Sequence, residues 1–211
     1  MPVDWSTHIR KCLDGTAPNH DTDQWLLPGL TKEQSRAHLR LFPERSIPAA
    51  VLIPLVERES GITVLLTRRA TQLKNHAGQI SFPGGRMEPE DVGPREAALR
   101  EAREEIGLDP GFVSVAGYLP DHIILSGFRV TPVVGFVSPG FELFLDRFEV
   151  ESTFEVPLAH VFDPANHRTR LRRLGASEVE FEVYDIPYGE YSIWGATAGM
   201  LVSLYRLCGI Q

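Results

Sequence analysis

The sequence predicts an α+β fold, a sandwich in which a mixed β-sheet is combined with helices. Apolar runs rich in β-branched residues occur between residues 49 and 137 and indicate strands. Several runs are joined by short turns, which favours hairpins. Segments with helical spacing lie between and after the runs. Hairpins mixed with helices favour an α+β architecture over a doubly wound parallel sheet.

Several apolar runs predict strands. The runs AAVLIPLVE and GITVLLTRR, at 49–57 and 61–69, have the turn RESG between them and predict a hairpin. Further apolar runs predict strands at 112–119 and 128–137. The segments TRLRRL at 169–174 and EVEFEVYDI at 178–186, with GAS between them, predict a second hairpin.

Helices are expected near 94–106 and 156–162, and from about residue 195 onward. The last of these is predicted to bury one apolar face, formed by Ala198, Leu201, Leu204 and Cys208. Residues 1–43 are predicted to form a polar helical extension, since Thr31 followed by Gln34 has the pattern of a capping box. The main domain is then predicted to span residues 44–211.

Composition limits the classes of function. A chain of 211 residues with 43% hydrophobic and 23% charged residues is typical of one globular domain. Its net charge of −7 argues against nucleic-acid binding, which needs clustered Lys and Arg. Two cysteines form neither a disulfide framework nor a zinc pattern, which favours a cytoplasmic location. No apolar run is long enough for a membrane span, so no membrane partner is expected.

The segment REAREEIGL, residues 100–108, concentrates negative charge on one side of the predicted helix. Glu101, Glu104 and Glu105 have i, i+3 and i+4 spacing and therefore share a narrow strip, where like charges repel. The apolar residues of the same helix form the adjacent flank, and Gly107 is expected to end it. Ion pairs with arginines of the helix would explain any single glutamate, but they explain poorly why three share one strip.

A glycine turn precedes this helix. Pro83, Gly84 and Gly85 end an apolar strand and allow the backbone to approach a ligand closely, and Asp91 is expected to cap the helix. Clustered carboxylates beside such a turn are the oxygen ligands that a cation such as Mg²⁺ binds together with substrate phosphates. The sequence therefore predicts a divalent metal site that relieves the repulsion.

The segment GGRMEPEDVGPREAALREAREEIGL resembles the Nudix box, G-x5-E-x7-R-E-U-x-E-E-x-G-U. The second half matches from Arg100 to Leu108. The first acid of the box is replaced by Asp91, and eight residues instead of seven separate it from Arg100. This resemblance implies an α/β/α sandwich with a catalytic loop-helix-loop that binds Mg²⁺ or Mn²⁺.

Three flanking segments resemble the coenzyme A pyrophosphatase branch of the Nudix hydrolases. They are LLTRRATQLKNHAGQISFPGG at 65–85, LSGFRVTPVVGFV at 125–137 and IPYGEYSIWGATAGML at 186–201. The resemblance implies hydrolysis of the diphosphate of coenzyme A, or of acyl-CoA or oxidised CoA, to 3′,5′-ADP and 4′-phosphopantetheine.

The resemblance also implies roles for individual residues. Metal binding is expected from Glu101, Glu104 and Glu105, and catalysis from Glu104, Glu105, Arg100 and Glu149. Arg100 is expected to fix a helix glutamate by an ion pair, and Glu149 is a candidate general base. Substrate contacts are expected from Arg69, His76, Gly84, Gly85, Ser126 and Phe128.

Several of these roles have simpler alternatives. Glu149 is more simply explained as a charged loop residue. Arg69 has an alternative as a surface residue, and His76 has one as a structural residue, above which only its place in the branch signature raises it. Trp194 either stacks on adenine or packs against the terminal helix. Two other functions stay open: a Nudix hydrolase for ADP-ribose or NADH, and a non-catalytic binding module. Residues 1–43 either cover the site or form a homodimer contact.

Overall fold

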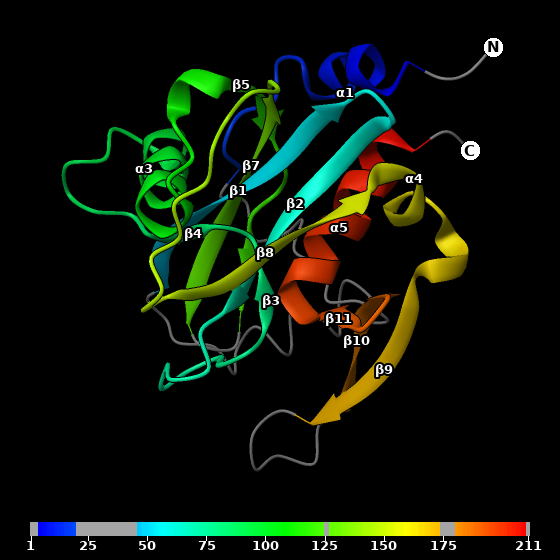
Figure 1. The fold of residues 1–211 in the computed structure, drawn as a ribbon. Helices are drawn as coiled ribbons and strands as arrows, with labels where there is room; N and C mark the ends of the chain where they lie inside the picture. The colour runs from blue at the N-terminus through cyan, green and yellow to red at the C-terminus, as the bar shows by residue number, and fades with distance from the viewer. Residues whose placement is uncertain (1–3, 20–45, 125–126, 174–179, 210–211) are drawn as a thin grey trace.

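The computed structural model describes residues 4–19, 46–124, 127–173 and 180–209 (Figure 1). In these residues a mixed eight-stranded sheet has the order β3-β2-β1-β7-β5, with β4 also paired to β1, β6 to β7 and β8 to β2. The strands are β1 (Ile47–Arg58), β2 (Gly61–Arg69), β3 (Ile80–Ser81), β4 (Gly84–Arg86), β5 (Val113–Tyr118), β6 (His122–Ile123), β7 (Phe128–Val137) and β8 (Val150–Pro157).

The hairpin expected at 49–69 and the strands expected at 112–119 and 128–137 are confirmed as β1, β2, β5 and β7. Strands β1 and β2 are antiparallel and meet at the pair Arg58 and Gly61. Strand β7 occupies 128–137 as expected and runs parallel to β1 over its whole length. Strand β8 was not expected, because its sequence VESTFEVP lacks a long apolar run. It pairs with β2 at the edge of the sheet.

Successive residues of β1 pack into two different hydrophobic layers. Ala50, Leu52 and Val56 belong to the layer under α3, whereas Ile53 and Leu55 belong to the layer under α5. A strand covered on both faces needs apolar residues at consecutive positions. This double burial explains the continuous apolar run in the sequence.

Helices cover both faces of the large sheet (Figure 1). Helix α3 (Pro94–Ile106) covers one face, and α5 (Gly195–Cys208) and the short α4 (Leu158–Val161) cover the other. The expected apolar face of α5 is fully buried, including Ala198 and Cys208. The architecture is the expected α/β/α sandwich. Single 3₁₀ turns occur at Pro110–Phe112 and Pro164–Asn166.

The second expected hairpin is part of a small separate sheet. It contains β9 (Arg168–Arg173), β10 (Glu180–Tyr188) and an unexpected β11 (Tyr191–Trp194), all antiparallel. Strand β11 leads directly into α5 and lies against β3 of the large sheet. This contact brings the segment around Trp194 to the edge of the large sheet.

Helix α1 (Trp5–Leu13) packs against α5 and β5. Its residues Ile9 and Leu13 are fully buried in the same hydrophobic layer as α5. The helix expected from Thr31 lies outside the described residues, so the boundary near residue 43 stays a prediction. Within the described residues, no helix combines the length and the apolar character needed to cross a bilayer.

Candidate active site

The glycine turn, residues 83–85, is in direct contact with the glutamate helix. The prediction of a tight turn was wrong for its last two residues: Pro83 lies at a bend, but Gly84 and Gly85 begin strand β4, because their backbone pairs with β1. Gly85 belongs to β4, and a Cβ atom added to it would lie 2.5 Å from the carboxyl carbon of Glu101. Gly84 has a φ of 158°, and a Cβ there would lie 2.4 Å from the carbonyl oxygen of Ala50. Only glycine allows this close approach of β4 to β1 and to the carboxylate. The turn therefore sets the distance between the sheet and the glutamates.

The three glutamates differ in their surroundings. Glu105 is buried, with 4% of its surface exposed, and Glu101 is half-buried. The side chain of Glu104 is 59% exposed. Their apolar neighbours Ala98 and Ala102 are fully buried against the sheet, as the helical spacing predicted. The strip of carboxylates therefore lies at the border between the core and solvent.

Arg100 connects the acidic groups. Its Nη1 atom donates to Glu101 Oε1 at 2.9 Å and to Glu104 Oε2 at 3.0 Å. Its Nε and Nη2 atoms donate to the two carboxylate oxygens of Asp91 at 3.1 and 2.9 Å. A fork of this kind is specific to arginine, because a lysine offers one point charge. The geometry matches the ion pair expected for Arg100.

Asp91 does not cap the helix, contrary to the sequence prediction. Helix α3 begins after Gly93, which has no side-chain cap, and Asp91 instead accepts from the amide of Glu88 at 2.8 Å. The side-chain hydrogen bonds from Arg100 lower the pKa of Asp91, so its charge balances the guanidinium. The prediction failed because only the residue directly before the helix can cap it, and Asp91 comes two residues before that position, which Gly93 occupies. At the other end, Gly107 ends the helix with a φ of 69°, as expected.

Glu105 is held from two sides. Its Oε2 atom accepts from the amide of Gly84 at 3.1 Å, and its Oε1 atom lies 3.7 Å from Nη1 of Arg69. Burial raises its pKa to about 8, and the charges of Glu101 and Glu149 act in the same direction. Burial also raises the pKa of Glu101. Two carboxylates that resist ionisation therefore lie next to each other in the absence of a cation.

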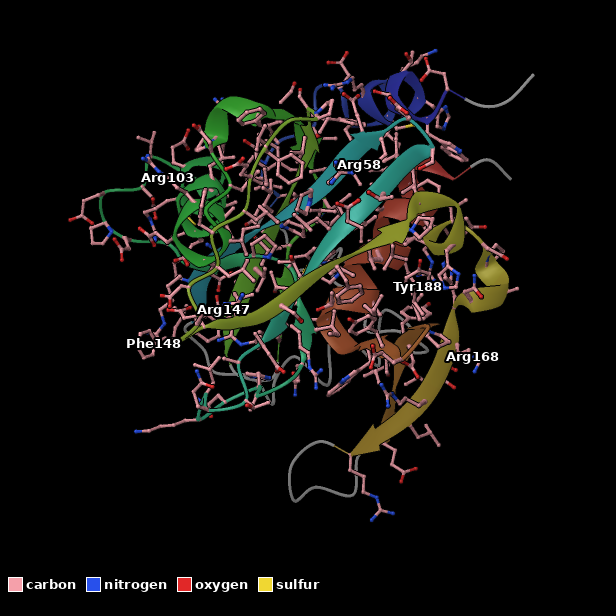
Figure 2. All side chains as sticks on the ribbon, in the orientation of Figure 1. Arg58, Arg103, Arg147, Phe148, Arg168 and Tyr188 are labelled. Atoms are coloured by element: carbon pink, nitrogen blue, oxygen red, sulfur yellow. The ribbon has the colours of Figure 1, made fainter. Side chains whose placement is uncertain are left out.

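Glu149 lies on a turn that is attached to the helix. The amide of Asp146 donates to the carbonyl oxygen of Glu105 at 2.9 Å, and the amide of Glu149 donates to the carbonyl oxygen of Asp146 at 3.0 Å. Figure 2 shows Arg147 and Phe148 beside the start of β8, and Gln72 Nε2 donates to the carbonyl oxygen of Arg147 at 3.0 Å. Glu149 is exposed, and its charge raises the pKa of Glu105. The turn thus places a solvent-accessible carboxylate within electrostatic reach of the metal candidates.

The remaining expected site residues are His76, Phe128 and Ser126. His76 is exposed, has a φ of 58°, and its Nδ1 atom lies 2.9 Å from Gln79 Oε1. Phe128 lies at the start of β7, with the guanidinium carbon of Arg86 5.2 Å from its ring centroid. Ser126 lies outside the described residues. The sequence did not predict the contact of Arg86 with the site: its carbonyl oxygen accepts from Nη2 of Arg100 at 3.0 Å.

The donor set suits a divalent cation. Within the described residues, no group of three carboxylate, imidazole or thiolate side chains is arranged to hold a metal ion, and Arg100 pairs with both Glu101 and Glu104. The chemistry of the set nevertheless fits, since all the donors are carboxylate oxygens whose mutual repulsion a divalent ion would relieve. The close contact between Gly85 and Glu101 fixes this carboxylate against the glycine turn.

Comparison with known proteins decides the family. The model of the NUDIX domain matches residues 46–176. The chain is a Nudix hydrolase. It is 40% identical over 165 residues to the uncharacterized Nudix hydrolase NudL of Escherichia coli (strain K12), a match that covers 77% of this chain and 83% of that protein. NudL of Enterobacter sp. (strain 638) is 39% identical over 164 residues, with the same coverage.

Solved structures are also similar to this Nudix hydrolase. The crystal structure of DR0079 from Deinococcus radiodurans aligns with a TM-score of 0.49 and 14% identity, over 82% of this chain and 90% of that one. The family membership makes the chain an enzyme that acts on a nucleoside diphosphate derivative. Enzymes of this family generally use divalent metal ions, which agrees with the carboxylate strip of α3.

Proposed function

We propose that the chain hydrolyses the diphosphate bond of coenzyme A, giving 3′,5′-ADP and 4′-phosphopantetheine. The observation that carries the hydrolytic part is the contact of the carboxylate strip with Gly84, Gly85 and Arg69. The choice of coenzyme A rests on the three flanking segments at 65–85, 125–137 and 186–201. Two of these segments, far apart in the sequence, lie against each other where β3 contacts β11.

Glu101, Glu104 and Glu105 would hold Mg²⁺ or Mn²⁺. When bound, the ion neutralises phosphate charge and stabilises the charge that develops on the leaving oxygen. Glu105 would be the inner ligand, because it is buried and fixed by the Gly84 amide. Glu104, more than half exposed, would be the outermost one. Metal binding requires Glu105 to lose its proton, so affinity would increase with pH up to about 8.

The other residues would bind and orient the substrate. Arg69 lies at the end of β2, and its guanidinium faces Glu105, where it would bind a phosphate oxygen of the diphosphate. Arg100 would keep Glu101 and Glu104 oriented through its hydrogen bonds to both. Glu149 would accept the proton of the attacking water, because its turn holds an exposed carboxylate beside the buried ones.

Product analysis tests this proposal. The purified chain is incubated with coenzyme A, acetyl-CoA, ADP-ribose or NADH, with Mg²⁺ or Mn²⁺, and the products are separated by chromatography. We expect 3′,5′-ADP from coenzyme A and no product from the Glu105→Gln variant. Cleavage of ADP-ribose or NADH with coenzyme A intact would keep the Nudix chemistry and refute the proposed substrate. Equal cleavage by the parent chain and Glu105→Gln would refute the proposed metal site.

Glu149 needs a separate test, since it is exposed and easily replaced. Glu149→Gln is expected to lower kcat by roughly 10²- to 10⁴-fold, as loss of a general base does, with little change in metal affinity. Glu142→Gln is a matched control, because Glu142 is an exposed carboxylate in the same connection between β7 and β8. Equal activity of the two variants would exclude Glu149 as the base.

A further inference from the structure

A cavity of about 280 Å³ lies between the segment 77–80 and the hairpin of β10 and β11. Its lining includes Arg68, Gln79, Glu190, Tyr191, Ser192 and Trp194. We propose that this cavity binds the purine base of the substrate. This inference rests on the proposed function and names the part of the substrate that the cavity recognises.

Two consecutive residues of β2 face the cavity and the candidate metal site. Arg69 faces Glu105 on the α3 side of the sheet, and Arg68 lines the cavity. Side chains of consecutive strand residues point to opposite faces. Two backbone hydrogen bonds fix the segment 77–80 to this strand. The amide of Gly78 donates to the carbonyl oxygen of Arg69 at 3.1 Å, and the amide of Arg69 donates to the carbonyl oxygen of Gln79 at 2.9 Å. A substrate with its diphosphate at Arg69 would pass around the end of β2 to reach the cavity.

The two aromatic side chains of the cavity are held in place. The guanidinium carbon of Arg170 lies 5.0 Å from the ring centroid of Trp194, and the ring of Tyr191 stacks on Phe154 with a centroid distance of 3.7 Å. Arg170 is itself fixed by a hydrogen bond to Asp185 at 3.2 Å. An indole fixed in this way offers a flat, preorganised surface, and binding to it costs little side-chain entropy.

The charges of the lining favour a neutral ring over a phosphate. Arg68 is paired with Glu151, with 3.5 Å between Nε and Oε2, so its charge is partly balanced. Glu190 adds an exposed carboxylate at the rim, which repels an anion but accepts a hydrogen bond from an exocyclic amino group. The cavity is also smaller than the roughly 300–1,000 Å³ that drug-sized ligands occupy. It suits one amino-bearing base, such as adenine, and excludes a whole dinucleotide.

Binding of mononucleotides tests the cavity without any cleavage. Isothermal titration calorimetry of the full chain with Mg²⁺ compares AMP, IMP and ribose 5-phosphate, which share the phosphate and differ in the base. We expect AMP to bind roughly 5- to 100-fold more tightly than ribose 5-phosphate, the factor that corresponds to stacking of one base. Trp194→Leu should abolish this difference, and Trp194→Phe should restore most of it.

Two further variants make the result specific. Glu190 is exposed and lies on a turn, so we expect the Glu190→Gln variant to fold like the parent chain. The variant should bind AMP with a smaller preference over IMP. Phe144→Ala is the matched control, because Phe144 is an exposed aromatic side chain near the end of α3, and it should bind AMP like the parent chain. Equal binding of AMP and ribose 5-phosphate by the parent chain, or full AMP affinity in Trp194→Leu, would overturn the inference.

The outcomes separate this inference from the proposed function. If AMP binds as described but coenzyme A is not cleaved, the cavity still binds the base and only the proposed substrate is wrong. If coenzyme A is cleaved and the kinetic parameters of Trp194→Leu equal those of the parent chain, the base binds elsewhere. An increase in KM at unchanged kcat in Trp194→Leu supports the cavity, since binding outside the reacting groups acts on KM.

Discussion

Replacing Glu105 by Gln is expected to stabilise the metal-free protein progressively as the pH increases. In the parent chain, burial raises the pKa of Glu105 from 4.5 to about 8. A carboxyl group whose pKa is raised by folding contributes stability below pH 4.5, and this contribution is lost as the pH increases toward 8. Gln keeps an oxygen acceptor for the Gly84 amide but cannot ionise, so the variant lacks this loss.

The size of the effect follows from the same pKa. Each pH unit between the unfolded and the folded pKa corresponds to about 1.4 kcal/mol. Between about pH 5 and pH 8 the difference in unfolding free energy between the variant and the parent should therefore change by on the order of 4 kcal/mol in favour of the variant. Only the difference between the two proteins is compared, because other groups titrate in both.

Urea unfolding at constant ionic strength, with a chelator present, measures this difference at several pH values. Glu104→Gln is the control for loss of one negative charge, because it removes a 59% exposed carboxylate from the same helix. Parallel pH profiles of Glu105→Gln and the parent would refute the argument that Glu105 is costly to ionise. Added Mg²⁺ should stabilise the parent more than Glu105→Gln at about pH 8, since the proposed ligand is the ionised carboxylate.

Three further changes have defined expected results. Arg100→Ala removes the guanidinium that binds Asp91, Glu101 and Glu104. We expect this variant to bind metal roughly 10- to 100-fold more weakly in titration calorimetry, and Arg100→Lys to restore only part of the affinity. Gly85→Ala places a Cβ atom 2.5 Å from the carboxyl group of Glu101, so kcat/KM should fall strongly while Gly93→Ala, whose Cβ would meet only a Glu96 oxygen at 3.5 Å, stays active. Ile9→Ala should lower the unfolding free energy by about 2–5 kcal/mol, as for a fully buried side chain, and a change within about 0.5 kcal/mol would show that α1 is not part of the core.

The fold was largely predictable because its elements have strong local patterns. The limits of α3 follow from its apolar spacing and from Gly107, and β7 follows from an unbroken apolar run. Strands β4, β6, β8 and β11 were missed because they are short or polar. Their positions are fixed by pairing with β1, β7, β2 and β10. Local propensity is weak where the pairing partner decides the conformation.

The candidate site shows the same division. The spacing of Glu101, Glu104 and Glu105 predicted one strip of carboxylates, because helical geometry is fixed by sequence separation. The bidentate pair of Arg100 with Asp91 was not predicted, because it depends on the path of the loop between Gly85 and Gly93. The turn from Asp146 to Glu149 was also not predicted, since a backbone hydrogen bond to the carbonyl oxygen of Glu105 leaves no pattern in the sequence.

The sequence by itself determined the α+β class and the carboxylate strip of α3, because each depends on residues close together in the chain. Only the tertiary structure decided how deeply each glutamate is buried, and hence that the pKa of Glu105 is raised to about 8. It also decided that the segment around Gly78 and the segment around Trp194 line one cavity. Burial and contacts between distant segments arise from packing, and packing depends on the whole chain at once.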